Sequence, residues 1–166
     1  MRISPIGWIA NSEEEVKQLS YNVTSVTHDH PEGIKGAETV AMCVYYARIG
    51  KSKEFIRDYI FTQYPEVATL KYDDLVKNFY HGEETCQATL PQALYCFLIS
   101  KSFEDCLKTT ISIGGDCDTT AAVSCAIAEA YYKKIPLGIG YRTIRLLPKD
   151  VLQVVKKVYN KFKDNH

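Results

Sequence analysis

The sequence predicts an all-α fold for a single domain spanning residues 1–166. Apolar residues recur at helical spacing along most of the chain, and no stretch alternates apolar and polar residues for long enough to predict a strand. Of the 166 residues, 46% are hydrophobic and 24% are charged, which is the balance of a globular protein with one hydrophobic core. We therefore expect about seven helices and no internal repeat.

The first predicted helix covers residues 13–24. Ser12 can cap it, three glutamates follow in its first turn, and apolar residues recur along it at helical spacing. Residues 28–33 then break the pattern, because Pro31 restricts the residue before it to extended conformations and Gly33 permits a turn. We expect a loop there that carries three titratable side chains in a row.

Two longer helices are expected next. Residues 34–49 are apolar almost all round and stop at Gly50, which predicts a buried, central helix with a glycine at its C-terminal end. Ser52 opens an amphipathic helix that ends at Pro65.

The middle of the chain has weaker signals. Residues 72–75 indicate a short helix with a solvated acidic start, and residues 81–84 indicate a turn. Residues 89–98 predict a helix with Pro91 in its first turn, where the missing N–H costs nothing.

The last third of the chain predicts three more helices. Ser102 begins a near capping box for a helix over residues 102–113. The small side chains of residues 121–130 allow close backbone approach, so this helix should lie in the middle of the bundle. Residues 135–140 indicate a break, and Pro148 precedes an amphipathic terminal helix.

Composition excludes several classes of function. The formal net charge is zero, so no overall field would draw the chain to nucleic acid or acidic lipids. No apolar run approaches the ~20 residues that a membrane-spanning helix needs. The six cysteines form no CxxC pair or zinc-type spacing, and they are interpreted as reduced core residues of a cytoplasmic protein. We expect binding to neither nucleic acid nor membrane.

The densest group of chemistry-bearing residues follows the pair Gly114 and Gly115. Asp116, Asp118 and Thr119 place two carboxylates and a hydroxyl within four residues, directly before the small-residue helix. Carboxylates near a helix N-terminus can simply cap it. Oxygen ligands beside a glycine pair also suit magnesium or manganese, particularly if the surroundings are apolar. Both interpretations stay open on the residues alone.

Together with other segments, this motif resembles the ADP-ribosylglycohydrolases of the dinitrogenase-reductase-activating type. Residues 112–122 are similar to the most specific signature of that family, with Cys117 where serine or threonine is usual. Four further segments resemble family landmarks in the same order along the chain: residues 1–8, 25–37, 90–94 and 102–105. The resemblance implies an orthogonally packed helical bundle that is truncated at its N-terminus.

The resemblance also implies a metal-dependent hydrolase. Asp116, Asp118 and Thr119 would bind two Mg²⁺ or Mn²⁺ ions, with Asp118 bridging them and both aspartates acting in catalysis. Such a site would break the N- or O-glycosidic bond between ADP-ribose and a protein side chain, and two cations can polarise the leaving group and activate water. The expected ligand is therefore ADP-ribose or an ADP-ribosylated protein.

Four residues are expected near the substrate by the same resemblance: Gly114, Gly115, His28 and His30. The glycine pair would let the backbone approach a ligand closely. A histidine in a turn is more often a surface or hydrogen-bonded structural residue, so this alternative stays open for both histidines.

The sequence departs from the family at its start. It contains no Thr-Asp-Asp segment and no glycine-rich phosphate loop to complete the site, and the pair Asp73 and Asp74 lacks the flanking residues of that motif. Three interpretations follow: an enzyme that needs a complementing chain, an inactive ADP-ribose-binding module, or a structural remnant. An exposed apolar surface would favour a homodimer or a complementing partner over a monomer.

Overall fold

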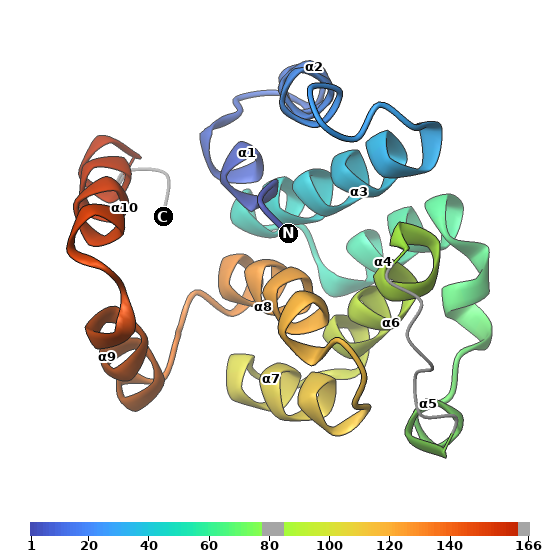
Figure 1. The fold of residues 1–166 in the computed structure, drawn as a ribbon. Coiled ribbons are helices and arrows are strands. Elements are labelled where there is room, and N and C mark those ends of the chain that lie inside the picture. The colour runs from blue at the N-terminus through green and yellow to red at the C-terminus, as the bar shows by residue number, and fades with distance from the viewer. Residues whose placement is uncertain (78–84, 163–166) are drawn as a thin grey trace.

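The computed structural model describes residues 1–77 and 85–162, and it confirms the all-α class for them (Figure 1). These residues form ten α-helices, one 3-10 helix and no strand, so the expected number of about seven helices was too low. In chain order they are α1 (Ser4–Ile9), α2 (Glu13–Thr24), α3 (Pro31–Arg48), α4 (Lys53–Gln63), η1 (Pro65–Thr69), α5 (Tyr72–Lys77), α6 (Cys86–Ile99), α7 (Phe103–Ser112), α8 (Cys117–Tyr132), α9 (Leu137–Leu146) and α10 (Lys149–Phe162).

Two helices form the centre of the molecule, as the sequence predicted. Helix α3 packs against α1, α2, α4, α6 and α8, and α8 packs against α1, α3, α6 and α7. The core between them contains fully buried large side chains, among them Met42, Phe97 and Ile127. Small residues on α8 allow its neighbours to approach closely, which is why it occupies this position.

Most predicted helix ends are confirmed by their hydrogen bonds. The hydroxyls of Ser12, Ser52 and Ser102 each accept the backbone N–H three residues later, at 3.1, 3.2 and 3.1 Å. Gly50 has a φ of 81°, and its N–H and that of Lys51 close the end of α3 by donating to the carbonyls of Ala47 and Tyr46. This is the paired closure expected of a glycine that follows a helix.

The loop predicted for residues 28–33 is shorter than expected, because α3 begins at Pro31 instead of residue 34. A proline suits the first helical position, since it has no N–H to leave unsatisfied. His30 is extended, with φ −127° and ψ 138°, and its Nδ1 accepts the Glu32 N–H at 3.3 Å. The histidine is therefore the N-cap of the central helix.

Two other helix boundaries differ from the prediction. Helix α6 begins at Cys86, so Pro91 lies inside the helix and not in its first turn. The break predicted at residues 135–140 is confined to the segment before Leu137, where α9 begins. Lys133 ends α8 in the left-handed region with φ 54°, and Gly138 and Gly140 are accommodated within α9.

Helix α1 was not predicted, although it helps to shape the interior. Gly7 packs against α3 so closely that a Cβ atom there would lie 2.5 Å from the Ala41 carbonyl oxygen. Arg48 binds the end of α1 by donating to the carbonyl oxygens of Trp8, at 3.0 Å, and Ala10. A helix of six residues is too short to show clear helical periodicity in its sequence, and these contacts with α3 hold it in place.

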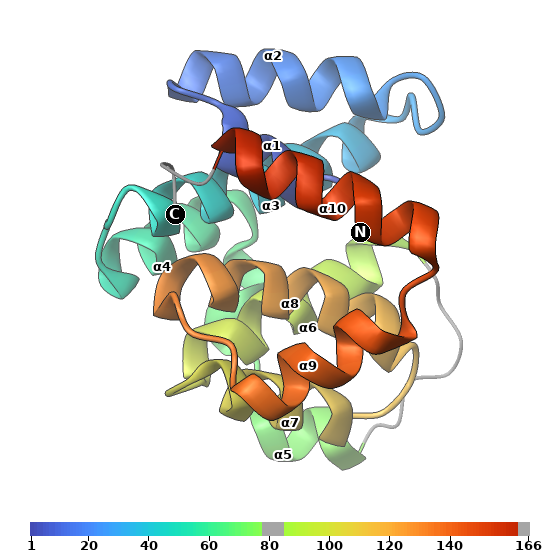
Figure 2. The same ribbon diagram turned by 90° about the vertical axis from the view of Figure 1, so that its left-hand side faces the viewer.

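The last two helices stand apart from the rest of the molecule in Figure 1, and they lie in front of the bundle in Figure 2. Neither α9 nor α10 contains a buried residue, and neither takes part in the main helix packing. Ile135 and Ile139 do pack against the core. The chain therefore has a bundle, α1 to α8, and a C-terminal arm, defined here as residues 133–162.

Other predictions have mixed outcomes. All six cysteines are free thiols; Cys43, Cys96 and Cys106 are buried as expected, whereas the core position expected for Cys86 is wrong, because its side chain is exposed. The turn predicted at residues 81–84 lies outside the described residues. Within the described part of the chain, no helix has the length and apolar character needed to cross a membrane.

Glu129 on α8 should make stability depend on pH. Burial raises the pKa of its carboxyl above the ordinary value of 4.5. A raised carboxyl pKa means that the native state favours the protonated form, so this group costs stability as pH rises through and above 4.5. Glu129→Gln should therefore raise the melting temperature at neutral pH, and the difference from the natural chain should vanish below pH 4.5. Thermal unfolding of both chains across this range measures the effect, and an equal difference at every pH would exclude it.

Candidate functional site

The turn between α7 and α8 depends on its two glycines. Gly114 and Gly115 have φ values of 75° and 69°, in the left-handed region that other residues rarely adopt. The N–H of Cys117 donates to the Gly115 carbonyl at 2.8 Å, which tightens the turn. This geometry places Asp116 at the N-cap of α8 and Asp118 and Thr119 in its first turn.

Asp116 occupies the capping position at the start of α8. Its carbonyl oxygen accepts the backbone N–H and the hydroxyl of Thr120, at 3.0 and 2.9 Å. Its carboxylate makes no capping hydrogen bond as well formed as those of the Ser12 and Ser102 hydroxyls on α2 and α7, although the Thr119 backbone N–H, three residues later, is one of the groups that lower its pKa. Capping therefore accounts for only part of the interactions of this carboxylate.

The two aspartates and the threonine lie within reach of one another. The pKa of Asp116 is below its usual range because the side chains of Asp118 and Thr119 contact its carboxylate. Asp116 is partly exposed and Asp118 is exposed, so these carboxylates do not have the apolar surroundings that would most favour a cation. Solvent stabilises both charges here, and burial alone does not require a cation.

A cavity of about 180 Å³ lies beside this motif. It is lined mainly by apolar and hydroxyl side chains from the start of the chain and from α2, α3, α6 and α8. Thr119 is the one residue of the motif in its lining, so the two carboxylates lie outside the cavity wall. A drug-sized ligand usually occupies about 300–1,000 Å³, so the described residues enclose only part of a ligand as large as ADP-ribose.

The residues expected near a substrate separate into two groups. His28 lines the cavity, whereas His30 caps α3 and lies outside the lining. Gly114 and Gly115 also lie outside it, and their left-handed conformation gives them a structural role. Of the site residues predicted from the sequence, His28 and Thr119 are therefore the two that the structure places in the cavity wall.

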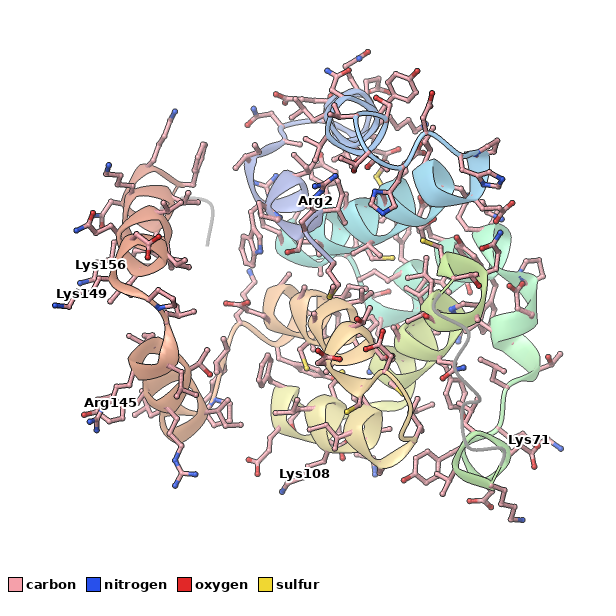
Figure 3. The ribbon with its side chains drawn as sticks, viewed as in Figure 1. Arg2, Lys71, Lys108, Arg145, Lys149 and Lys156 are labelled. Atoms are coloured by element: carbon pink, nitrogen blue, oxygen red, sulfur yellow. The ribbon has the colours of Figure 1, made fainter. Side chains whose placement is uncertain are left out.

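Arg2 was missed by sequence reasoning, although it lines the same cavity. Its guanidinium donates to the Thr27 hydroxyl, which in turn lies 2.7 Å from Nδ1 of His28 (Figure 3). A guanidinium presents several donors in a plane that matches phosphate and carboxylate groups. An isolated arginine near the start of a chain carries no sequence pattern, and only the fold shows its position.

The donor set suits a hard cation but is incomplete. Two carboxylates and one hydroxyl supply the oxygen ligands that magnesium and manganese prefer. All three come from a single helix start, and no group of three His, Cys, Asp or Glu side chains in the described residues could hold a metal ion. These residues fit an ion that keeps most of its water, or one that receives further ligands from elsewhere.

Comparison with known proteins identifies the family. The family model described as ADP-ribosylglycohydrolase matches residues 1–166. The chain belongs to the ADP-ribosylglycohydrolase family. Its all-helical fold agrees with that of this family.

One curated relative within this family is the ADP-ribosyl-[dinitrogen reductase] glycohydrolase of Rhodospirillum rubrum. It is 27% identical to this chain over 119 residues, which is 68% of the chain and 38% of the relative. The chain therefore spans well under half of the length of this glycohydrolase.

Proposed function

We propose that this chain contributes the Asp116, Asp118 and Thr119 ligands of a two-metal site that hydrolyses the glycosidic bond between ADP-ribose and a protein side chain. The observation that carries the proposal is the carboxylate of Asp116, which interacts chiefly with the side chains of Asp118 and Thr119 and so gathers three oxygen donors at the start of α8. Family membership supplies the reaction class.

The cation and the chain have separate roles in this proposal. Bound Mg²⁺ or Mn²⁺ would polarise the bond that breaks and lower the pKa of water. The carboxylates of Asp116 and Asp118 would hold the ion at the start of α8, next to Thr119 in the cavity lining. Arg2 and His28, which line the same cavity, would orient the phosphate groups of the ligand.

The incomplete donor set has a consequence for activity. Three ligands from one turn leave a divalent ion weakly held, because such ions take six or more oxygen ligands in proteins. We propose that a second polypeptide completes the site and that hydrolysis needs it.

The test uses ADP-ribosylated dinitrogen reductase as the substrate and follows the release of ADP-ribose. The chain is assayed with Mg²⁺, with Mn²⁺ and with a chelator, alone and mixed with the part of the R. rubrum glycohydrolase that this chain does not match. Metal-dependent release in the mixture supports the proposal. If no mixture releases ADP-ribose although calorimetry shows that the chain binds it, the proposed hydrolysis is wrong and the chain only binds the ligand.

The alternative function is an inactive module that binds ADP-ribose. The observation in its favour is that Arg2, His28 and Thr119 line one cavity, whereas the metal ligands do not form a complete set within the described residues. Calorimetric titration with ADP-ribose in the presence of a chelator distinguishes the two, because a metal-independent pocket keeps its affinity there.

A further inference from the structure

The C-terminal arm presents an apolar stripe that none of the described residues, 1–77 and 85–162, buries. On α10, Val151, Val154, Val155 and Val158 lie at helical spacing with exposed fractions of 41, 59, 48 and 43%. A helix with such a stripe normally packs it against a core. Here no residue of α10 is buried.

The charge of the chain is segregated between the arm and the bundle. Residues 133–162 contain eight Lys and Arg and one Asp, a formal charge of +7. Residues 1–132 contain eleven Lys and Arg against eighteen Asp and Glu, a formal charge of −7. The net charge of zero therefore conceals a basic arm and an acidic bundle within one molecule.

The two faces of α10 point in opposite directions. Figure 3 shows Arg145, Lys149 and Lys156 directed away from the bundle. The valine stripe lies on the opposite side of the helix and so faces the bundle without being buried by it. Whatever covers the stripe must bring an apolar surface close to a bundle whose net charge is negative.

We propose that this partner is a second copy of the chain. A second α10 offers a matching valine stripe, and its outward lysines would then face the acidic bundle of the first copy. A two-fold axis makes both contacts reciprocal, so that each arm pairs its stripe with the other stripe and its basic face with the other bundle. The inference does not rest on the proposed hydrolase function.

An anionic membrane fits these observations less well. A surface-seeking helix lays its apolar face into the bilayer. On this arm that face points toward the acidic bundle, which an anionic surface would repel. A second copy satisfies the apolar stripe and the charges together.

Sedimentation equilibrium of the purified chain tests the proposal. We expect a dimer at low ionic strength that dissociates as salt is added, because salt screens the contact between arm and bundle. Val155→Asp places a charge in the stripe, and the double change Lys156→Glu with Lys157→Glu reverses the basic face. Each should weaken the dimer by about tenfold or more.

Matched controls lie on and beside α5, at the other end of the molecule (Figure 1). Val76 is 38% exposed and Lys71 and Lys77 are exposed, so Val76→Asp and the double change Lys71→Glu with Lys77→Glu repeat the same chemistry outside the arm. Both controls should keep the dimer, and circular dichroism should show that all variants are folded.

The outcomes that overturn the proposal are distinct. A natural chain that stays monomeric at every concentration in low salt would show that no second copy covers the stripe. A dimer that persists in both arm variants would place the interface elsewhere. Co-sedimentation of a monomeric chain with vesicles of phosphatidylserine and phosphatidylcholine would assign the stripe to a membrane instead.

Discussion

Asp118→Ala should strongly weaken metal binding at the start of α8 and with it any hydrolysis. Two carboxylates supply most of the attraction for the cation, and removing one leaves an aspartate and a threonine, which hold a hydrated ion poorly. We expect Mn²⁺ affinity, measured by calorimetry, to fall at least about tenfold and hydrolysis in the completed site to fall on the order of a hundredfold or more.

A matched substitution separates this effect from a loss of stability. Asp73 is also an exposed aspartate in the first turn of a helix, so Asp73→Ala removes the same group from α5. Losing a carboxylate near a helix N-terminus costs about 0.3–1 kcal/mol of stability in either variant. If Asp118→Ala lowers stability by this amount but keeps Mn²⁺ binding, Asp118 stabilises only the helix and the metal role is wrong.

Gly7→Ala should destabilise the bundle by about 1–3 kcal/mol. The added Cβ would lie 2.5 Å from the Ala41 carbonyl oxygen and 2.6 Å from the Val44 Cβ, and both belong to the central helix α3. Neither atom can rotate away, so α1 must move as a whole. This cost exceeds the roughly 1 kcal/mol by which alanine is favoured over glycine within a helix.

Gly138→Ala is the control for this change. Gly138 also lies inside a helix, but a Cβ there would meet nothing within 4 Å. It should raise stability by about 0.5–1 kcal/mol through helix propensity alone. Urea unfolding of both variants gives the comparison. If Gly7→Ala is as stable as Gly138→Ala, the close packing of α1 on α3 does not limit the size of residue 7, and the predicted loss of stability is wrong.

The parts of the fold that sequence predicted are those with local physical signals. Serine caps mark the starts of α2, α4 and α7, and Gly50 marks the end of α3, because these residues satisfy backbone groups within a few positions. The errors arose where a proline or glycine has two meanings. Pro31 starts a helix instead of preceding one, and Gly138 lies within a helix instead of breaking the chain.

The candidate site shows the same division. The sequence placed two aspartates and a threonine next to a glycine turn, and this spacing needs only the local chain. It gave no sign that Arg2 lies in the same cavity wall as His28 and Thr119, since these residues are far apart in sequence. It also gave the two histidines equal status, whereas one lines the cavity and the other caps α3.

The sequence by itself determined the helical class, the central position of α3 and α8, and a compact group of oxygen donors at the start of α8. Each of these depends on periodicity, side-chain size or hydrogen bonds over a few residues. Only the tertiary structure decided which residues share a cavity and that a basic arm stands apart from an acidic bundle. Those properties depend on packing between segments that are far apart in the chain, and such contacts produce no pattern over a few neighbouring residues.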